Sequence, residues 1–211
     1  MFVGHYAVAF VLKKKSNQIP LWELFLSVQL VDILAFLFVL LGVERVAYNP
    51  SPNPFLRTTI EYVPYSHSLF TNLIIALAVF LFFWRYKNKV WGLMLSIGIL
   101  SHWFLDVLVH VHDIPLFFDR VKVGLGLWNY PWIALGFEAI LLILAGCYVM
   151  RSSGIRIKYL VLIILLLISY LPIFFAPESE ATPAQASIVS LGLYSLFTAL
   201  SYWADRKKEV V

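Results

Sequence analysis

Three histidines and two aspartates stand close together in the segment SHWFLDVLVHVHD, whose other residues are mainly apolar. On a helix, His102, Asp106 and His110 are spaced by four residues and share one face, to which Asp113 returns one turn later. Imidazole and carboxylate groups are ligands that zinc and similar divalent cations take from proteins. The spacing therefore predicts a metal-binding stripe, whereas His112 points away from it and is expected at the membrane interface.

The helices that carry these residues are expected to lie in a membrane. The chain has 211 residues, of which 61% are hydrophobic and 13% charged, a composition outside the range of water-soluble domains. Six apolar runs each approach the roughly 20 residues that a spanning helix needs. They occupy residues 21–44, 66–84, 90–111, 129–150, 157–176 and 187–204. We predict an all-α polytopic bundle that forms a single membrane-embedded domain over residues 1–211.

A shorter apolar stretch, residues 1–12, precedes these runs and ends at three lysines. As a helix it measures roughly 18 Å and crosses only part of a hydrocarbon core of about 30 Å. Its positive charges follow the apolar stretch, the reverse of a secretory signal, so we expect the segment to be retained. The sequence therefore predicts an N-terminal half-helix that brings His5 beside Asp32 of the first span.

The basic residues predict the orientation of the bundle. Twelve of the 16 Lys and Arg residues fall on one side, in clusters at 13–15, 85–89, 151–158 and 206–208. Because cytoplasmic loops carry the excess of positive charge, this side and the C-terminus are expected to face the cytoplasm from the inner membrane. The outer loops are then 45–65, 112–128 and 177–183. The net charge of +4 is explained by topology and does not indicate a nucleic-acid partner.

Carboxylates inside the predicted spans need a compensating partner. A charge at the membrane centre costs roughly 2.5–3.5 kcal/mol on insertion scales, and Asp32, Asp106 and Glu138 all fall within spans. A divalent cation would compensate for this cost, with His102 and Asp106 from one helix and His67 and Asp32 from two others as ligands. The chain has one cysteine, so a cysteine-based zinc site is excluded. Zinc is the most plausible ion for a mixed imidazole and carboxylate site.

Four segments resemble the ordered motifs of a known family. They are GHYAVAF at 4–10, LVDIL at 30–34, YSHSL at 65–69 and LSHWFLDVLVH at 100–110. They are similar to motifs of membrane-bound, metal-dependent hydrolases that include the LexA-binding inner-membrane hydrolases. The resemblance covers roughly residues 1–150 and leaves 157–204 as accessory spans.

The resemblance implies a set of metal ligands and a class of reaction. The implied ligands are His5, Asp32, His67, His102 and Asp106. The implied reaction is hydrolysis of an ester, amide or phosphoester, which we expect in a lipid or lipid-linked substrate. The chain departs from the family pattern at Leu34, where a second aspartate is common, and lacks the basic residue usually found ahead of the Ser-His-Ser element. Both departures argue against a binuclear site and against a phosphate-type substrate.

Other interpretations of these residues stay open. Glu138 could be the general base, a further ligand or a partner that orients a histidine. The same buried groups, Asp32, Glu138 and His102, could relay protons or a metal ion in a transporter, or the metal could be structural in a non-catalytic bundle. Acidic and histidine residues are missing from the inner third of spans three to six. A pathway for ions or protons across the membrane usually needs polar residues along its length, so the sequence favours an enzyme or a structural site over transport.

Simpler explanations exist for individual residues. The pair His102 and Asp106 could be an interhelical hydrogen bond that holds a membrane bundle together. His67 could stand at the start of a helix with Ser66 as its N-cap, and His5 could lie at the interface. His110 and Asp113 could be outer-loop residues bonded to water.

Overall fold

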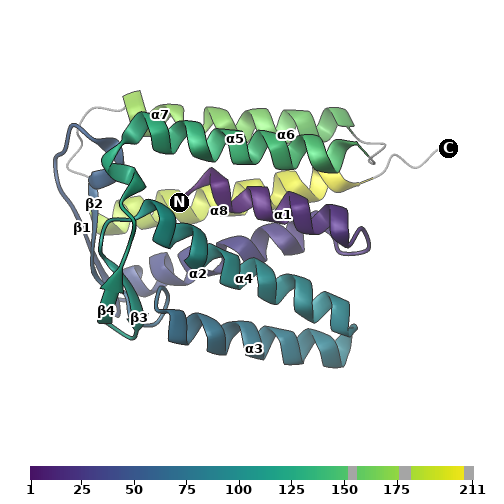
Figure 1. Ribbon diagram of the computed structural model, residues 1–211, viewed down its shortest axis with the longest axis horizontal. Helices are drawn as coiled ribbons and strands as arrows, with labels where there is room; N and C mark the ends of the chain where they lie inside the picture. Colours follow the sequence, from purple (N-terminus) through teal and green to yellow (C-terminus); the bar gives the residue numbers. More distant parts are fainter. Residues whose placement is uncertain (152–155, 176–181, 207–211) are drawn as a thin grey trace.

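Residues 1–151, 156–175 and 182–206 are described by the computed structural model, and within them helices dominate (Figure 1). Six helical stretches are long and apolar enough to cross a membrane, which confirms the predicted all-α, multi-pass membrane architecture. They are α2 (Leu21–Leu40), α3 (Leu69–Tyr86), α4 (Lys89–Val109), α5 (Pro131–Met150), α6 (Arg156–Ile168) continued by α7 (Leu171–Phe175), and α8 (Pro183–Asp205). The acidic loop predicted at 177–183 and the basic tail at 206–208 lie largely outside the described residues.

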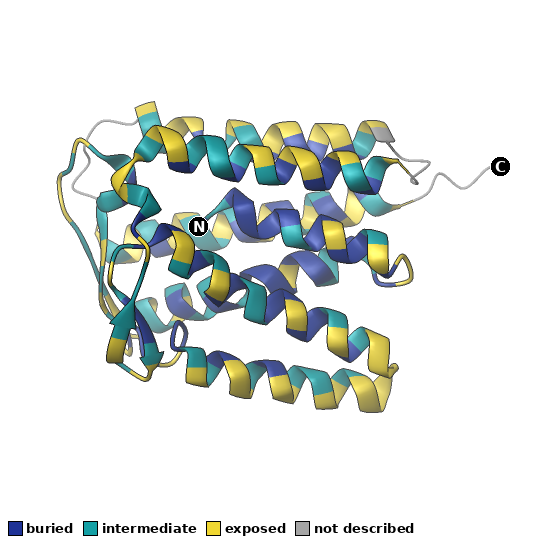
Figure 2. Ribbon diagram, in the orientation of Figure 1, coloured by how far each residue is buried: buried dark blue, intermediate teal, exposed yellow. Residues whose placement is uncertain are grey.

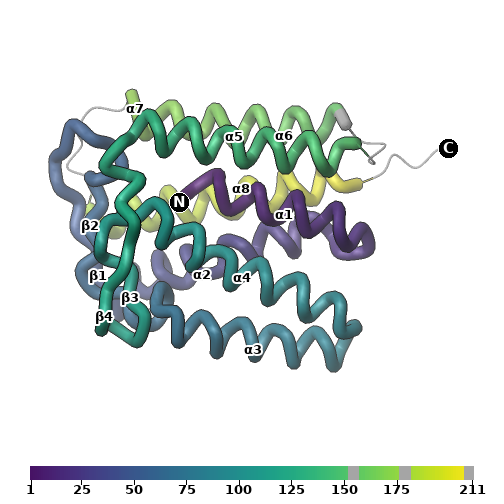
Figure 3. Tube along the Cα trace, in the orientation of Figure 1, coloured from purple at the N-terminus to yellow at the C-terminus, as the bar shows by residue number. Residues whose placement is uncertain are grey.

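The predicted half-helix is α1 (Val3–Lys15), which extends through the three lysines. It packs against α5, α2 and α4, and the trace in Figure 3 shows it running through the interior of the bundle. Figure 2 shows the contrast in burial between this helix and α3, whose surface is largely exposed. Because α1 is short and central, it can carry a polar residue into the middle of the molecule without facing lipid.

Side-chain caps define where several helices begin. Ser68 caps α3 by accepting a hydrogen bond from the Thr71 N–H, so the expectation that Ser66 is the N-cap is wrong. Asn88 caps α4 in the same way. Each cap satisfies an amide group that the first turn of a helix leaves without a partner. The residues Ser66 and His67 therefore stand ahead of α3, in an irregular segment.

The predicted outer loops contain two antiparallel hairpins at one end of the bundle, which we call the hairpin end (Figure 1). Strand β1 (Arg45–Tyr48) pairs with β2 (Thr58–Tyr62), and β3 (Ile114–Phe117) pairs with β4 (Arg120–Val123). Two short 3-10 helices, η1 (Pro54–Leu56) and η2 (Leu127–Asn129), complete these connections. Strands this short carry too few residues to produce a recognisable alternation of polarity, so the sequence did not reveal them.

Helix α4 ends at Val109, four residues before Asp113, the last residue of the predicted stripe. His110 is its C-cap residue and has an extended backbone. Asp113 is therefore not on the helical face that carries His102 and Asp106, and this part of the predicted stripe is wrong. Strand β3, which starts at Ile114, takes the chain away from the helix axis.

Candidate metal centre

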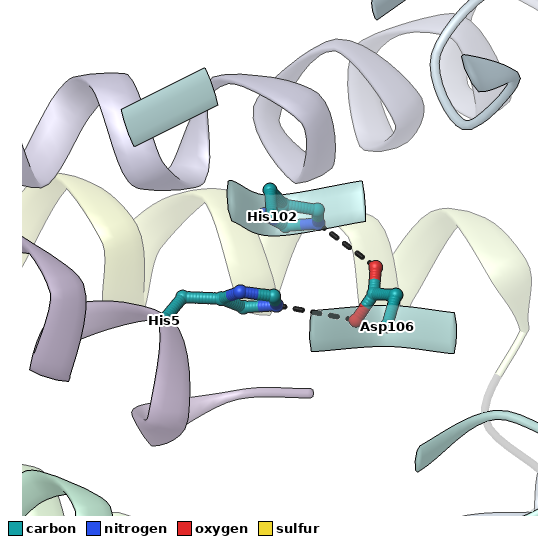
Figure 4. A group of neighbouring side chains, drawn as sticks. All are labelled: His5, His102 and Asp106. Carbon is teal, nitrogen blue, oxygen red and sulfur yellow. Dashed lines mark ion pairs between the residues drawn. The ribbon is translucent and has the colours of Figure 1, made fainter. Parts of the chain in front are cut away.

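Five residues that the sequence predicted as ligands meet in the half of the bundle nearer the hairpin end. His5 comes from α1, Asp32 from α2, His102 and Asp106 from α4, and His67 from the segment before α3. They form two overlapping groups, His5 with His102 and Asp106, and Asp32 with His67 and His102; within each, the ligand atoms lie within 4.8 Å of one another. Figure 4 shows the first group, in which both imidazole rings face the Asp106 carboxylate.

Nitrogen atoms of two histidines and oxygen atoms of two aspartates lie at distances from one another that suit metal ligands. Asp32 Oδ1 lies 3.4 Å from Nε2 of His67 and 3.4 Å from Nε2 of His102. Asp106 Oδ2 lies 3.0 Å from Nε2 of His102 and 3.7 Å from Nε2 of His67. Ligands about 2.0–2.1 Å from a tetrahedral zinc ion are roughly 3.3–3.4 Å apart. The four histidine–aspartate separations scatter around that value.

His102 has the tautomer that a metal ligand needs. Its Nδ1 lies 2.7 Å from the Val28 carbonyl oxygen, which can only accept, so Nδ1 carries a proton. Its Nε2 is fully buried and has no hydrogen-bond partner within the described residues, although carboxylate oxygens of Asp32 and Asp106 lie nearby. A buried nitrogen facing two carboxylates requires either a second proton or a cation between them. The residues present therefore fit a divalent cation.

His67 is oriented by two residues that the sequence did not single out, Glu44 and Ser66. The Ser66 hydroxyl lies 2.6 Å from Glu44 Oε2 and 2.9 Å from His67 Nδ1. Glu44 Oε1 also accepts the backbone N–H groups of Tyr65 at 2.8 Å and Ser66 at 2.9 Å. With Glu44 ionised, the single hydroxyl proton goes to the carboxylate, so Ser66 accepts from His67 Nδ1–H. The lone pair of His67 Nε2 is then directed at the aspartates.

This Glu44–Ser66–His67 chain is buried, with Glu44 only 1% exposed. A hydrogen-bonded partner behind a ligating histidine fixes its ring and raises its basicity. Sequence reasoning did not single out Glu44, because it is the last residue of the apolar run 21–44 and resembles the start of the following loop. Its contact with Ser66 depends on the β1–β2 hairpin, which returns the chain from the end of α2 to the start of α3.

His5 lies on the other side of Asp106. Its Nε2 is 3.2 Å from Asp106 Oδ1, and its ring stacks on that of His102 with centroids 3.7 Å apart and an interplanar angle of 7°. Both of its ring nitrogens lack a hydrogen-bond partner within the described part of the chain. The amino nitrogen of Met1 is 2.5 Å from the same carboxylate oxygen. Asp106 thus uses one oxygen toward α1 and the other toward His102 and His67.

Glu138 lies outside both ligand groups. Its Oε2 accepts the backbone N–H groups of Phe2 at 3.0 Å and Gly4 at 3.1 Å, at the start of α1. A carboxylate in this place satisfies amides that the first turn leaves free and favours the positive end of the helix dipole. The geometry favours a role in holding α1 and its His5 in place, and the assignment of Glu138 as general base stays a prediction.

Tyr194 is a further residue that the sequence did not reveal. Its hydroxyl donates to Asp32 Oδ2 at 2.9 Å, leaving Asp32 Oδ1 directed at the histidines. Tyr194 belongs to α8, within the region that the family resemblance left as accessory. The last span therefore contributes a hydrogen bond to the candidate centre.

His110 lies at the edge of the cluster. Its Nε2 is 3.9 Å from Asp106 Oδ1, and its Nδ1 is 3.1 Å from Asp113 Oδ1. Gly126, whose φ of 74° suits glycine, donates its N–H to the His110 carbonyl at 2.7 Å. Burial lowers the pKa of His110 below its ordinary value of 6.5. His110 is therefore held beside the site, whereas His112 is exposed.

A cavity of about 690 Å³ reaches the cluster, and Asp32, His67 and His110 are part of its wall. It is bounded by α2, α8, α7 and the β1–β2 hairpin. Comparison of the chain with family models, with curated proteins and with solved structures finds no match. The chemistry of this centre is accordingly argued from its residues and from the cavity that leads to it.

Proposed function

We propose that this protein is a membrane-embedded, metal-dependent hydrolase in which His67, His102 and Asp106 hold one divalent cation, Asp32 lies beside it, and one coordination position stays open for water. The observation that carries the proposal is the convergence of two imidazole nitrogens and two carboxylate oxygens, with histidine–aspartate separations of 3.0, 3.4, 3.4 and 3.7 Å. Two imidazoles with two carboxylates favour zinc. The resemblance of the four sequence motifs to the membrane-bound hydrolase family agrees with this assignment.

The chain's own residues have separable roles in such a reaction. When bound, zinc supplies a Lewis acid that polarises the ester and makes water a better nucleophile at neutral pH. Asp32 and Asp106 balance the charge of the cation, which matters because charge is poorly solvated at this depth. Tyr194 and the Glu44–Ser66 pair hold Asp32 and His67 in orientation.

Hydrolysis also needs a group that takes and returns a proton. Water adds to the carbonyl carbon or phosphorus, the bond to the leaving oxygen or, in an amide, nitrogen breaks, and the proton lost by water is delivered to that leaving atom. Glu138 is the first candidate for this transfer by sequence. His110 is the second, because it lines the cavity and its Nε2 lies 3.9 Å from Asp106.

The packing between the site and the end of the bundle where α1 ends at its three lysines supports an enzyme over a transporter. On α1 and α2, Phe10 and Phe25 follow the site in that direction, and both are fully buried. Their ring centroids are 5.6 Å apart, and Tyr6 lies 4.5 Å from Phe25. The rings of Phe10 and Phe25 offer a proton or metal ion no polar group with which to interact.

The test compares hydrolysis and transport in the same preparation. The wild-type chain and His102→Ala are reconstituted in vesicles, loaded with zinc, and supplied with carboxylic ester, amide and phosphoester substrates. Turnover by wild type that is lost in His102→Ala is the expected result. Zinc or proton flux without turnover would replace the proposal with the transporter, and bound zinc with neither activity would make the metal structural. His112→Ala is the matched control, because His112 is exposed and lies outside the cluster.

A further inference from the structure

The cavity beside the candidate centre has the size and lining of a ligand site. Its volume of about 690 Å³ lies within the range of roughly 300–1,000 Å³ typical of small-molecule pockets. Its wall is mainly apolar, with Phe36 and Val39 from α2, Leu193 from α8 and Ile60 from β2 among the contributors. Asp32, His67 and His110 line it next to the cluster, and the wall has further polar residues, among them Asn49, Arg57 and Gln185. An amphiphilic molecule would match a mainly apolar wall that also carries polar groups.

The position of the cavity indicates where such a molecule comes from. Val189 lines the cavity and is 62% exposed, so the cavity reaches the surface of α8. Val189 is about 9 Å along this spanning helix at a rise of 1.5 Å per residue, and its neighbour Ile188 is equally exposed. Exposed aliphatic side chains on a spanning helix face lipid. The cavity therefore opens toward the hydrocarbon of the bilayer at Val189, and the exposed polar residues Asn49 and Gln185 also line it.

A hydrocarbon chain suits the apolar wall of this cavity better than water does. Water in it would face aliphatic and aromatic walls with few hydrogen-bond partners, whereas a hydrocarbon chain would fill it with van der Waals contacts. Because the chain moves from lipid into an equally apolar space, little hydrophobic free energy is gained. The cavity would therefore serve mainly to position the ester group that follows the chain.

We propose that an acyl chain of a bilayer lipid occupies this cavity and places the lipid's ester bond at Asp32 and His67. The proposal deepens the hydrolase assignment and rests on it for the reaction, but not for binding. Cleavage of an acyl ester consumes one water and yields a fatty acid and a lysolipid. Cleavage at phosphorus yields diacylglycerol and a phosphorylated headgroup, so the products identify the bond.

Photochemical labelling measures occupancy without relying on turnover. The full chain is reconstituted in vesicles containing phosphatidylcholine with a diazirine in its acyl chain, irradiated, and mapped by mass spectrometry. Ala35 lines the cavity and is only 6% exposed, whereas Leu77 on α3 is 58% exposed and lies outside it. Label at Ala35 as well as at Leu77 is the expected result. Label at Leu77 alone would overturn the proposal.

A substitution that closes the opening tests the route. Val189→Trp should remove the label from Ala35 and leave that at Leu77, since a larger side chain fills the mouth. Leu196→Trp is the matched control, because Leu196 is on the same helix, 51% exposed and outside the cavity. It should keep both labels. Equal labelling of Ala35 in the two variants would contradict the proposed lipid route.

The same vesicles separate the two proposals. Label at Ala35 that Val189→Trp abolishes, together with no lipid product, would support the lipid site and refute the hydrolase. Label together with a fatty acid or a phosphorylated headgroup would support both. Metal content serves as the folding check, because closing the mouth leaves the ligand atoms in place.

Discussion

The hydrogen bonds of the Glu44–Ser66–His67 chain lead to a prediction about which nitrogen of His67 carries its proton. In Glu44→Gln the side chain keeps its shape, but the amide nitrogen can donate to the Ser66 hydroxyl. Ser66, which lies 2.9 Å from His67 Nδ1, can then donate its own proton to that nitrogen. His67 would carry its proton on Nε2, the atom that faces Asp32 and Asp106. The substitution therefore replaces a ligand lone pair with an N–H group.

The expected size follows from the role of such partners in metal sites. Loss of a hydrogen-bonding group behind a ligand typically lowers metal affinity by about 10–100-fold, equal to roughly 1.4–2.8 kcal/mol of binding free energy. Ser66→Ala should fall in the same range, because it leaves His67 Nδ1–H and Glu44 Oε2 without their buried partner. Zinc affinity is measured by competition with a chelator of known Kd.

Ser68→Ala is the matched control for this series. Ser68 is buried in the same segment and caps α3 through the Thr71 N–H, so its loss should cost about 1 kcal/mol of stability. It has no contact with the Glu44–Ser66–His67 chain among the hydrogen bonds of the described residues. Zinc affinity in Glu44→Gln equal to that of wild type or of Ser68→Ala would refute the reasoning.

Three further predictions concern the base, the last span and the topology. Glu138→Gln keeps an oxygen that can accept from the amides of α1. If Glu138 is the base, this variant should keep zinc and lose turnover, whereas loss of both would show that Glu138 positions the site instead. Tyr194→Phe removes the 2.9 Å hydrogen bond to Asp32 and should weaken zinc binding by about tenfold or less, as a net loss of roughly 0.5–1.5 kcal/mol implies; unchanged affinity in chelator competition would show that Asp32 needs no such support. In a cysteine-free background, Asn88→Cys should resist an impermeant thiol reagent added outside intact cells and Leu125→Cys should react; the reverse pattern would invert the orientation.

The spans and several candidate ligands could be predicted from the sequence for physical reasons. Spanning helices must be apolar over a length that the bilayer fixes, and His102 and Asp106 share a face because helical spacing is regular. The end of α4 could not be predicted, because the backbone becomes extended at His110, where the chain leaves the helix toward β3. Asp113 reaches His110 through that turn and not along a helix.

The residues that orient the ligands could not be found from spacing alone. Glu44 and Ser66 are 22 residues apart, and Tyr194 is 162 residues from Asp32. Such contacts depend on how the hairpin folds and on which helix packs beside α2. Glu138 was recognised as a buried carboxylate, but its bonds to the start of α1 could not be foreseen without the position of that helix.

The zinc content of the purified chain tests the central claim most directly. Wild type, Asp106→Ala and His112→Ala are purified in detergent without chelator, equilibrated with zinc and measured by elemental analysis. The two variants compare loss of a proposed ligand with loss of an exposed histidine. Asp106 lies within 3.7 Å of Nε2 atoms from three histidines, so its loss should abolish binding. The account predicts about one zinc ion per chain in wild type and in His112→Ala and none in Asp106→Ala. Folded wild type that binds no zinc, or Asp106→Ala that binds as much as wild type, would contradict it.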